Sequence, residues 1–224
     1  MQTSSSTGDG DPAEDSVTVE SCWEEVYSAS LASAPSGITS VNGSWGGHSY
    51  SSKDGVSCLY QSSDWNVSYI PVTRGSTDYE RIEIDVWWPG SSSYRSFDVY
   101  AFGEQYGTSD VYDALWFGSD TSNSWIIGGD TTSSSTKVAD WSKNIISTGQ
   151  WVSLAFEVDH SAVTVDFDVD GTAKANALVI SDSAWVSGTQ VVLSSDGLAS
   201  SVSADTCWAN LVIYESEVAT DCFD

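Results

Sequence analysis

Two runs of alternating apolar and polar residues lie close together in residues 151–171, WVSLAFEVDHSAVTVDFDVDG. The apolar positions are Val152, Leu154, Phe156 and Val158 in the first run and Val163, Val165, Phe167 and Val169 in the second. Alternation with a period of two predicts β-strands with one buried face, and residues 159–162 between the runs form turns readily. A hairpin with one apolar face must pack on a second layer. The pattern therefore predicts a β-sandwich rather than a parallel α/β core.

The same alternation recurs along the chain. Residues 81–88 place Ile82, Ile84, Val86 and Trp88 on one face and Arg81, Glu83, Asp85 and Trp87 on the other. After a turn at 89–93, residues 96–102 place Phe97, Val99 and Ala101 opposite Asp98, Tyr100 and Phe102. Residues 208–214, WANLVIY, predict the last strand. Short strands separated by Gly and Ser indicate an all-β, antiparallel two-sheet sandwich.

The length of 224 residues suits one domain of this class. Residues 1–20 are polar and Ser- and Gly-rich, and we expect a flexible N-terminal tether there, followed by a single β-sandwich domain over 21–224. The tether resembles the stretch after the lipid-bearing cysteine of bacterial lipoproteins, which implies a lipid anchor upstream. No apolar run reaches transmembrane length, so we expect no membrane insertion.

The charge balance restricts the partners. The chain has 32 acidic and 7 basic residues, a formal net charge of −25. Such a field repels phosphate backbones and anionic lipids, so nucleic acid and membrane surfaces are disfavoured as partners. Solubility is the simplest interpretation of the charge, and an acidic surface for a cationic partner or metal is the alternative.

Four isolated cysteines, at positions 22, 58, 207 and 222, lack the spacing of a zinc site and indicate disulfides. Three pairings are possible. We favour the nested pairs Cys22–Cys222 and Cys58–Cys207, because a sandwich with neighbouring first and last strands would let each bond close a long loop. Disulfides imply an oxidising compartment, and we expect an extracellular, periplasmic or cell-surface protein.

Several segments together resemble a known superfamily. Gly149-Gln150-Trp151, the following strand, turn and strand, and Asp170-Gly171 are similar to the G-x-W, strand, turn, strand, D-G region of laminin-G-like, concanavalin A-like jelly rolls. The closing 208–214 resembles the final strand of that superfamily. The resemblance implies a jelly-roll sandwich. It leaves the activity open, because lectins, adhesion modules, glycoside hydrolases and polysaccharide lyases share this fold.

One segment bears on catalysis. Glu83-Ile84-Asp85-Val86 resembles the start of the E-x-D-x-E signature of the laminarinase-like retaining glycoside hydrolases. The third carboxylate would fall at Trp87, or at Trp88 in the bulged variant of the motif. Tryptophan cannot transfer a proton, so the acid/base that a retaining mechanism requires is missing from its place. We therefore assign no catalytic residue and expect binding rather than cleavage.

Two further patterns have simpler explanations. Asp166-x-Asp168-x-Asp170-Gly171 fits the opening of a calcium loop, but the bidentate glutamate expected later falls at Ala177. These residues also fit the solvated face of a strand, so Ca²⁺ stays an alternative and no cofactor is required. The two histidines, His48 and His160, fall in a loop and a turn, where we expect them to be solvated.

Eleven tryptophans and ten tyrosines are many for this length. Most should fill the core, but an aromatic plane beside carboxylates is also what a sugar ring binds. We predict a secreted or cell-surface module that binds a poly- or oligosaccharide on a concave face without cleaving it. The alternatives are a hydrolase or lyase of the same fold and a surface adhesion or structural protein with a protein partner. The predicted ligand-binding residues are Glu83, Asp85, Trp87, Asp98, Tyr100 and Trp45.

Overall fold

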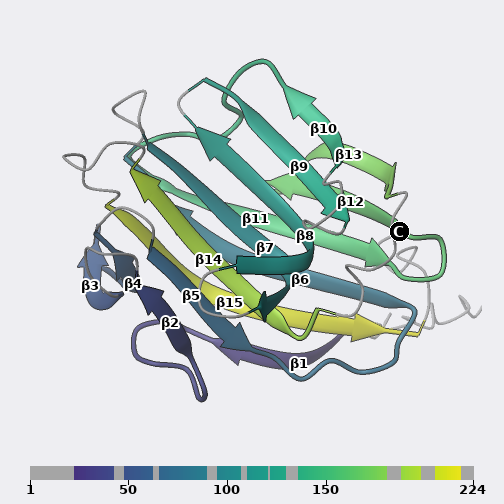
Figure 1. Ribbon diagram of the computed structural model, residues 1–224, viewed down its shortest axis with the longest axis horizontal. Helices are drawn as coiled ribbons and strands as arrows, with labels where there is room; N and C mark the ends of the chain where they lie inside the picture. The colour runs from purple at the N-terminus through teal and green to yellow at the C-terminus, as the bar shows by residue number, and fades with distance from the viewer. Residues whose placement is uncertain are drawn as a thin grey trace, which may run out of the picture.

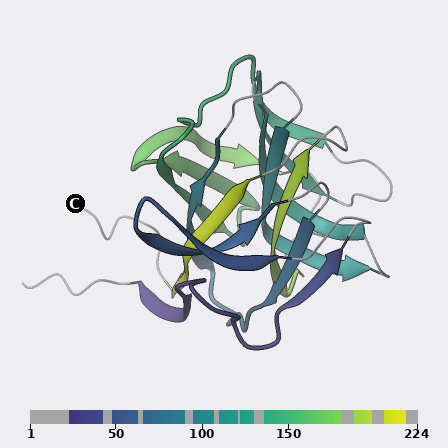
Figure 2. The same ribbon diagram turned by 90° about the vertical axis from the view of Figure 1, so that its left-hand side faces the viewer.

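The computed structural model describes residues 23–42, 48–62, 66–89, 95–106, 110–120, 122–129, 136–180, 188–197 and 205–217. Over these ranges the chain forms two antiparallel sheets and no helix. Figure 1 shows the strands in two overlapping layers, and Figure 2 shows the same layers turned by 90°. The predicted all-β two-sheet sandwich is confirmed. The predicted tether at 1–20 lies outside the described residues.

Sheet A has eight strands, in the order β13-β12-β11-β6-β15-β4-β3, with β1 also paired to β15. Its strands are β1 (Glu24–Ala29), β3 (Ser49–Lys53), β4 (Val56–Gln61), β6 (Tyr79–Trp87), β11 (Trp151–Asp159), β12 (Thr164–Val169), β13 (Thr172–Val179) and β15 (Thr206–Ser216).

Sheet B has seven strands, in the order β10-β9-β8-β7-β14-β5-β2. Its strands are β2 (Thr39–Asn42), β5 (Asn66–Pro71), β7 (Arg95–Tyr106), β8 (Asp110–Asp120), β9 (Ser124–Gly129), β10 (Thr136–Trp141) and β14 (Gln190–Gly197). No helix in the described part of the chain is long and apolar enough to cross a membrane.

The core lies between the inward faces of the two sheets. In the predicted hairpin, Phe156 of β11 is the register partner of Phe167 of β12, and both are fully buried. Phe167 also stacks on Phe117 of sheet B, with ring centroids 4.7 Å apart. Elsewhere in the core, the Phe97 ring packs edge-on against Trp88 and Trp208, with ring centroids 5.3 and 5.6 Å apart. Aromatic side chains therefore supply much of the contact between the layers.

Cys58 of β4 and Cys207 of β15 form a disulfide, the pairing predicted for these two cysteines, with their Cα atoms 5.6 Å apart. Both residues are fully buried, and their bond joins positions 149 residues apart in sequence. A bond that closes so long a loop removes much conformational freedom from the unfolded chain. Cys22 and Cys222 lie outside the described residues, and their pairing stays a prediction.

Replacing both described cysteines, Cys58→Ala with Cys207→Ala, should lower the free energy of unfolding by about 2–5 kcal/mol. The measurement is urea unfolding followed by tryptophan fluorescence, with circular dichroism as a check that the sandwich still forms. An unchanged unfolding midpoint would show that the bond contributes nothing. The same double substitution at Cys22 and Cys222 tests the second predicted bond, because a comparable loss is expected only if those cysteines are joined.

Candidate functional site

The predicted binding residues fall on two different sheets. Glu83, Asp85 and Trp87 lie on β6 of sheet A, and their alternating neighbours fill the core. Asp98 and Tyr100 lie on β7 of sheet B, again opposite core residues. Each group therefore faces away from the core on its own side of the sandwich. The prediction that these five residues line one concave face is wrong, because β6 and β7 belong to different sheets. Trp45, the sixth predicted residue, lies outside the described residues.

On sheet A, Trp87 is engaged by the β3–β4 hairpin. Its indole Nε1 donates a hydrogen bond of 3.0 Å to Asp54 Oδ2, and the Lys53 ammonium lies 4.4 Å from its ring centroid. The neighbouring Trp151 donates from Nε1 to the carbonyl oxygen of Lys53 at 3.2 Å. These two indoles hold the turn of the hairpin against the outer face of the sheet, beside the Cys58–Cys207 bond. We therefore assign Trp87 a structural role.

The carboxylates of the E-x-D segment are also held by neighbours. Arg81 donates from Nε to Glu83 Oε1 at 2.6 Å and bonds Glu157 through Nη1. Asn210 donates from Nδ2 to Asp85 Oδ2 at 2.8 Å. Burial raises the pKa of the Glu157 carboxyl against the opposing pull of Arg81. A guanidinium bonded to both Glu83 and Glu157 suits a surface ion network better than an acid and nucleophile pair.

The three aspartates of the calcium-loop pattern do not act as one group. Asp170 accepts a hydrogen bond of 2.9 Å from the backbone N–H of Ser153 on β11, while Asp166 accepts one from Ala177 on β13. Asp170 itself has φ +51° and closes the turn before β13. Among the described residues, no three His, Cys, Asp or Glu side chains are placed to hold a metal ion.

The outer face of sheet B gathers aromatic side chains. Tyr100 of β7 and Trp116 of β8 are register partners, and their rings stack with centroids 5.2 Å apart and planes 24° apart. Burial raises the pKa of the Tyr100 phenol well above its usual value, and Asp98 and Tyr69 add to the rise. Tyr100 therefore keeps its O–H proton at neutral pH.

Gly118 of β8 lies between Asp98 and Trp125, its register partners on β7 and β9. A Cβ atom at this position would lie 2.3 Å from Asp98 Oδ1 and 2.3 Å from Trp125 Nε1. Both side chains therefore lie over Gly118, in space that the side chain of any other residue would fill. We call Asp98, Tyr100, Trp116 and Trp125 the sheet-B platform.

Sequence reasoning named Asp98 and Tyr100 but missed Trp116 and Trp125. A signal was present: Phe117 and Ile126 are core residues, and the period of two places the tryptophans next to them on the outer face. Because large aromatic residues usually fill cores, the alternation alone could not show that Trp125 stays half-buried on the outer face, beside a Trp116 that is only 9% exposed.

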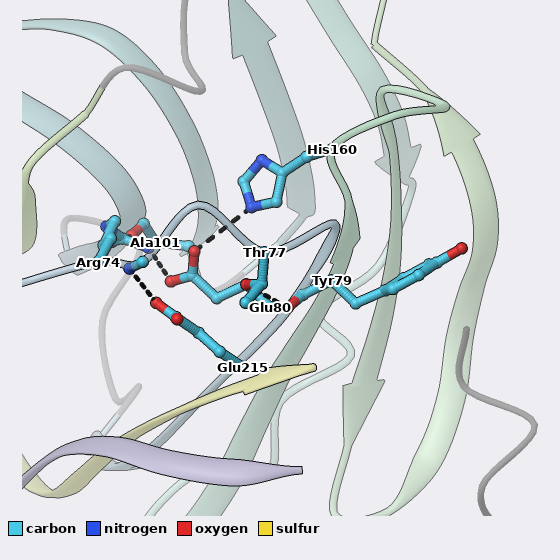
Figure 3. Close-up of polar contacts among 8 residues, drawn as sticks. Arg74, Thr77, Tyr79, Glu80, Ala101, His160 and Glu215 are labelled. Carbon is cyan, nitrogen blue, oxygen red and sulfur yellow. Dashed lines mark hydrogen bonds and ion pairs between the residues drawn. The ribbon is translucent and has the colours of Figure 1, made fainter. Parts of the chain in front are cut away.

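A buried ion cluster at one end of the sandwich was also missed (Figure 3). Glu80 of β6 and Glu215 of β15 are register partners that point between the sheets, with 2% and 7% of their surfaces exposed. Arg74 bonds Glu80, and its guanidinium carbon lies 3.9 Å from the Phe102 ring centroid. Burial lowers the pKa of Arg74, and the two glutamates oppose that shift.

The remaining contacts of this cluster satisfy both carboxylates. The backbone N–H of Gly75 donates to Glu215, and Nε2 of His160, from the β11–β12 turn, lies 3.4 Å from Glu80 Oε2. The expectation of a solvated His160 is therefore wrong: its side chain is 23% exposed and packs edge-on against Phe102. Glu80 is ion-paired with Arg74, and the charge of Glu215 also acts on that arginine, so the cluster suits a structural role better than acid/base chemistry.

No family of known sequences matches the chain, and no curated protein matches it. Solved structures do. The globular domain of T. cruzi calreticulin superposes with a TM-score of 0.61 at 10% identity, covering 85% of this chain and 88% of that one. The carbohydrate recognition domain of Emp46p in its potassium-bound form has a TM-score of 0.59 at 10% identity. The match covers 88% of this chain and 99% of that one.

Domain 4 of AbnA, a GH43 extracellular arabinanase from Geobacillus stearothermophilus solved with arabinotriose, has a TM-score of 0.56 at 15% identity, covering 90% and 99%. The fold is a concanavalin A-like jelly roll. The fold that the resemblance of the C-terminal segments implies is thereby confirmed. Identities this low show the fold alone; of these neighbours, one is a carbohydrate recognition domain and one was solved in complex with arabinotriose.

Replacing Arg74 by Met should lower the free energy of unfolding by about 3–5 kcal/mol, because it leaves Glu80 and Glu215 buried without their cation. Lys137→Met is the matched control. The Lys137–Asp140 pair spans 3.2 Å with both side chains about half exposed, so its loss should cost less than about 1 kcal/mol. Urea unfolding at neutral pH measures both. Equal losses would contradict a stabilising role for the buried cluster.

Proposed function

We propose that this protein binds a poly- or oligosaccharide on the sheet-B platform without cleaving it. The observation that carries the proposal is the meeting of Asp98 and Trp125 over Gly118, beside the stacked Tyr100–Trp116 pair. A sugar ring presents an apolar C–H face and a rim of hydroxyls. An indole accommodates the first, and a carboxylate and a phenol bond the second.

The platform supports binding better than hydrolysis. It contributes one carboxylate, Asp98, and the nearby Asp140 of β10 is ion-paired with Lys137. Hydrolysis of a glycosidic bond by the common mechanisms requires two carboxyl groups on either side of the bond. The other described aspartates of these strands are engaged, Asp140 with Lys137 and Asp120 with the backbone N–H groups of Ser122 and Asn123.

The disulfide supports the proposed compartment. A fully buried bond between Cys58 and Cys207 persists where thiols are not kept reduced, which favours an extracellular, periplasmic or cell-surface location. The net charge of −25 agrees with a partner other than nucleic acid.

Two alternatives are separated from this proposal by assay. A hydrolase or lyase of the same fold would release reducing or unsaturated ends from the glycan that it binds. An adhesion protein with a protein partner would bind no glycan on an array. Glycan-array binding with no reducing-sugar release supports the proposal, and release of product would replace it by the enzymatic alternative.

The central test compares one tryptophan from each sheet. Trp125→Ala should raise the dissociation constant for the bound oligosaccharide at least about tenfold, because an aromatic anchor at the centre of a site contributes about 2 kcal/mol or more. Trp87→Ala should leave that constant within about twofold and lower stability, since Trp87 holds the β3–β4 hairpin. Isothermal titration calorimetry and urea unfolding measure the two effects. The reverse result would move the site to sheet A.

A further inference from the structure

Lys137 and Asp140 lie beside Trp125 on the outer face of sheet B because β10 contains a bulge. β10 is the edge strand of this sheet, next to β9 (Figure 1). Residues three apart in a regular strand point to opposite faces. In β10 the register with β9 shifts after Lys137, which is the partner of Ile127, so that Asp140 is the partner of Trp125. Ile126 between these partners is a core residue, and the bulge thus places both charged residues on the outer face.

The two charged groups form an exposed pair at the edge of the indole. Lys137 Nζ lies 3.2 Å from Asp140 Oδ2, and both side chains are about half exposed. The same ammonium lies 5.4 Å from the ring centroid of Trp125. On the other sheet, the ammonium of Lys53 lies closer to the Trp87 centroid, at 4.4 Å. Lys137 is therefore placed toward the edge of its indole rather than over the centre.

Both charged groups keep capacity for further hydrogen bonds. An ammonium donates up to three hydrogen bonds and a carboxylate accepts about four, and the bond from Lys137 to Asp140 uses one of each. A surface pair of this kind is also held weakly, because water competes for both groups. A ligand can therefore bond to both groups without breaking a strong interaction.

The pair suits two neighbouring hydroxyls of one sugar ring. The Nε1 edge of Trp125 lies over Gly118 on β8, whereas Lys137 and Asp140 flank the indole from β10, on the other side of β9. A sugar stacked on the indole presents hydroxyls around the edge of its own ring. On the β10 side one hydroxyl accepts from the ammonium, which can only donate, and the next donates to the carboxylate, which can only accept. Hydroxyls on adjacent carbons are close enough to span a donor and an acceptor 3.2 Å apart.

We infer that Lys137 and Asp140 extend the sheet-B platform into a subsite for two neighbouring hydroxyls of one sugar unit. The inference rests on the proposed function and names its ligand class, which is glycans whose internal units keep hydroxyls on adjacent carbons. β-1,4-glucan, β-1,4-xylan and α-1,5-arabinan have such a pair, and we call them the diol glycans. Internal units of β-1,3-glucan have no two hydroxyls on adjacent carbons, so this polymer falls outside the class.

The experiment uses the full chain, with hexasaccharides of the three diol glycans and long soluble chains of β-1,3-glucan as probes. Isothermal titration calorimetry measures the dissociation constants. For a diol glycan that binds, Lys137→Met and Asp140→Ala should each raise the constant at least about fivefold, because each removes a hydrogen bond to a charged group. Where β-1,3-glucan binds, the same variants should leave its constant within about twofold of the wild-type value.

Lys143→Met is the matched control. Lys143 is an exposed lysine that follows β10, so this variant changes the net charge by the same amount as Lys137→Met and leaves the Lys137–Asp140 pair in place. It should keep every dissociation constant within about twofold of the wild-type value. Circular dichroism checks that each variant forms the sandwich.

Each outcome decides for or against the subsite. Unchanged binding of a diol glycan by either variant of the pair would overturn the inference, and a loss of binding in Trp125→Ala would then leave the proposed function standing. Tighter binding would also overturn it, because the pair would then be covering the indole. An equal loss in Lys143→Met, or binding of β-1,3-glucan in preference to all three diol glycans, would overturn it too. Failure of every glycan to bind would overturn the proposed function and the inference with it.

Discussion

The packing of β6 against β7 across the core is the constraint on which the rest of this structure depends. Ile82, Ile84, Val86 and Trp88 point inward from one sheet, and Phe97, Val99 and Ala101 point inward from the other. Trp88 and Trp208 both contact Phe97, so the two layers are fixed where the chain crosses between them. A slip of one residue in either strand would turn every outer side chain inward, and the alternation therefore decides which residues can meet a ligand.

The two outer faces that result differ in how their side chains are held. On sheet A, charged groups and indoles are bonded to one another: Arg81 links Glu83 to Glu157, and Trp87 and Trp151 hold the β3–β4 hairpin. On sheet B, the side chains stack on one another and on a glycine. The proposed function places the sugar on sheet B, because aromatic rings beside a carboxylate suit a sugar ring better than an ion network does.

Much of this fold could be predicted from the sequence, because alternation over 81–88 and 151–169 has one structural interpretation. Irregular positions could not. A bulge between Tyr100 and Phe102 returns Phe102 to the core although its parity predicts the outer face, and Asn210, with φ +52°, shifts the phase of β15 between Ala209 and Val212. The connection after Trp88 could not be interpreted either, since a short loop serves a hairpin within one sheet as well as a crossing between sheets. For this reason Glu83 and Asp98 were assigned to one surface.

The site was predictable only in part. Asp98 and Tyr100 could be named because they alternate with core residues. The position of Gly118 between Asp98 and Trp125 depends on strand register, which the sequence does not show. The ion cluster joins residues 74, 80, 160 and 215, which no local pattern connects.

The most direct test of the account is a glycan titration followed by NMR of the tryptophan indole N–H signals. The account predicts that the signals of Trp116 and Trp125 shift and those of Trp87 and Trp151 do not. Shifts confined to Trp87 and Trp151 would contradict it.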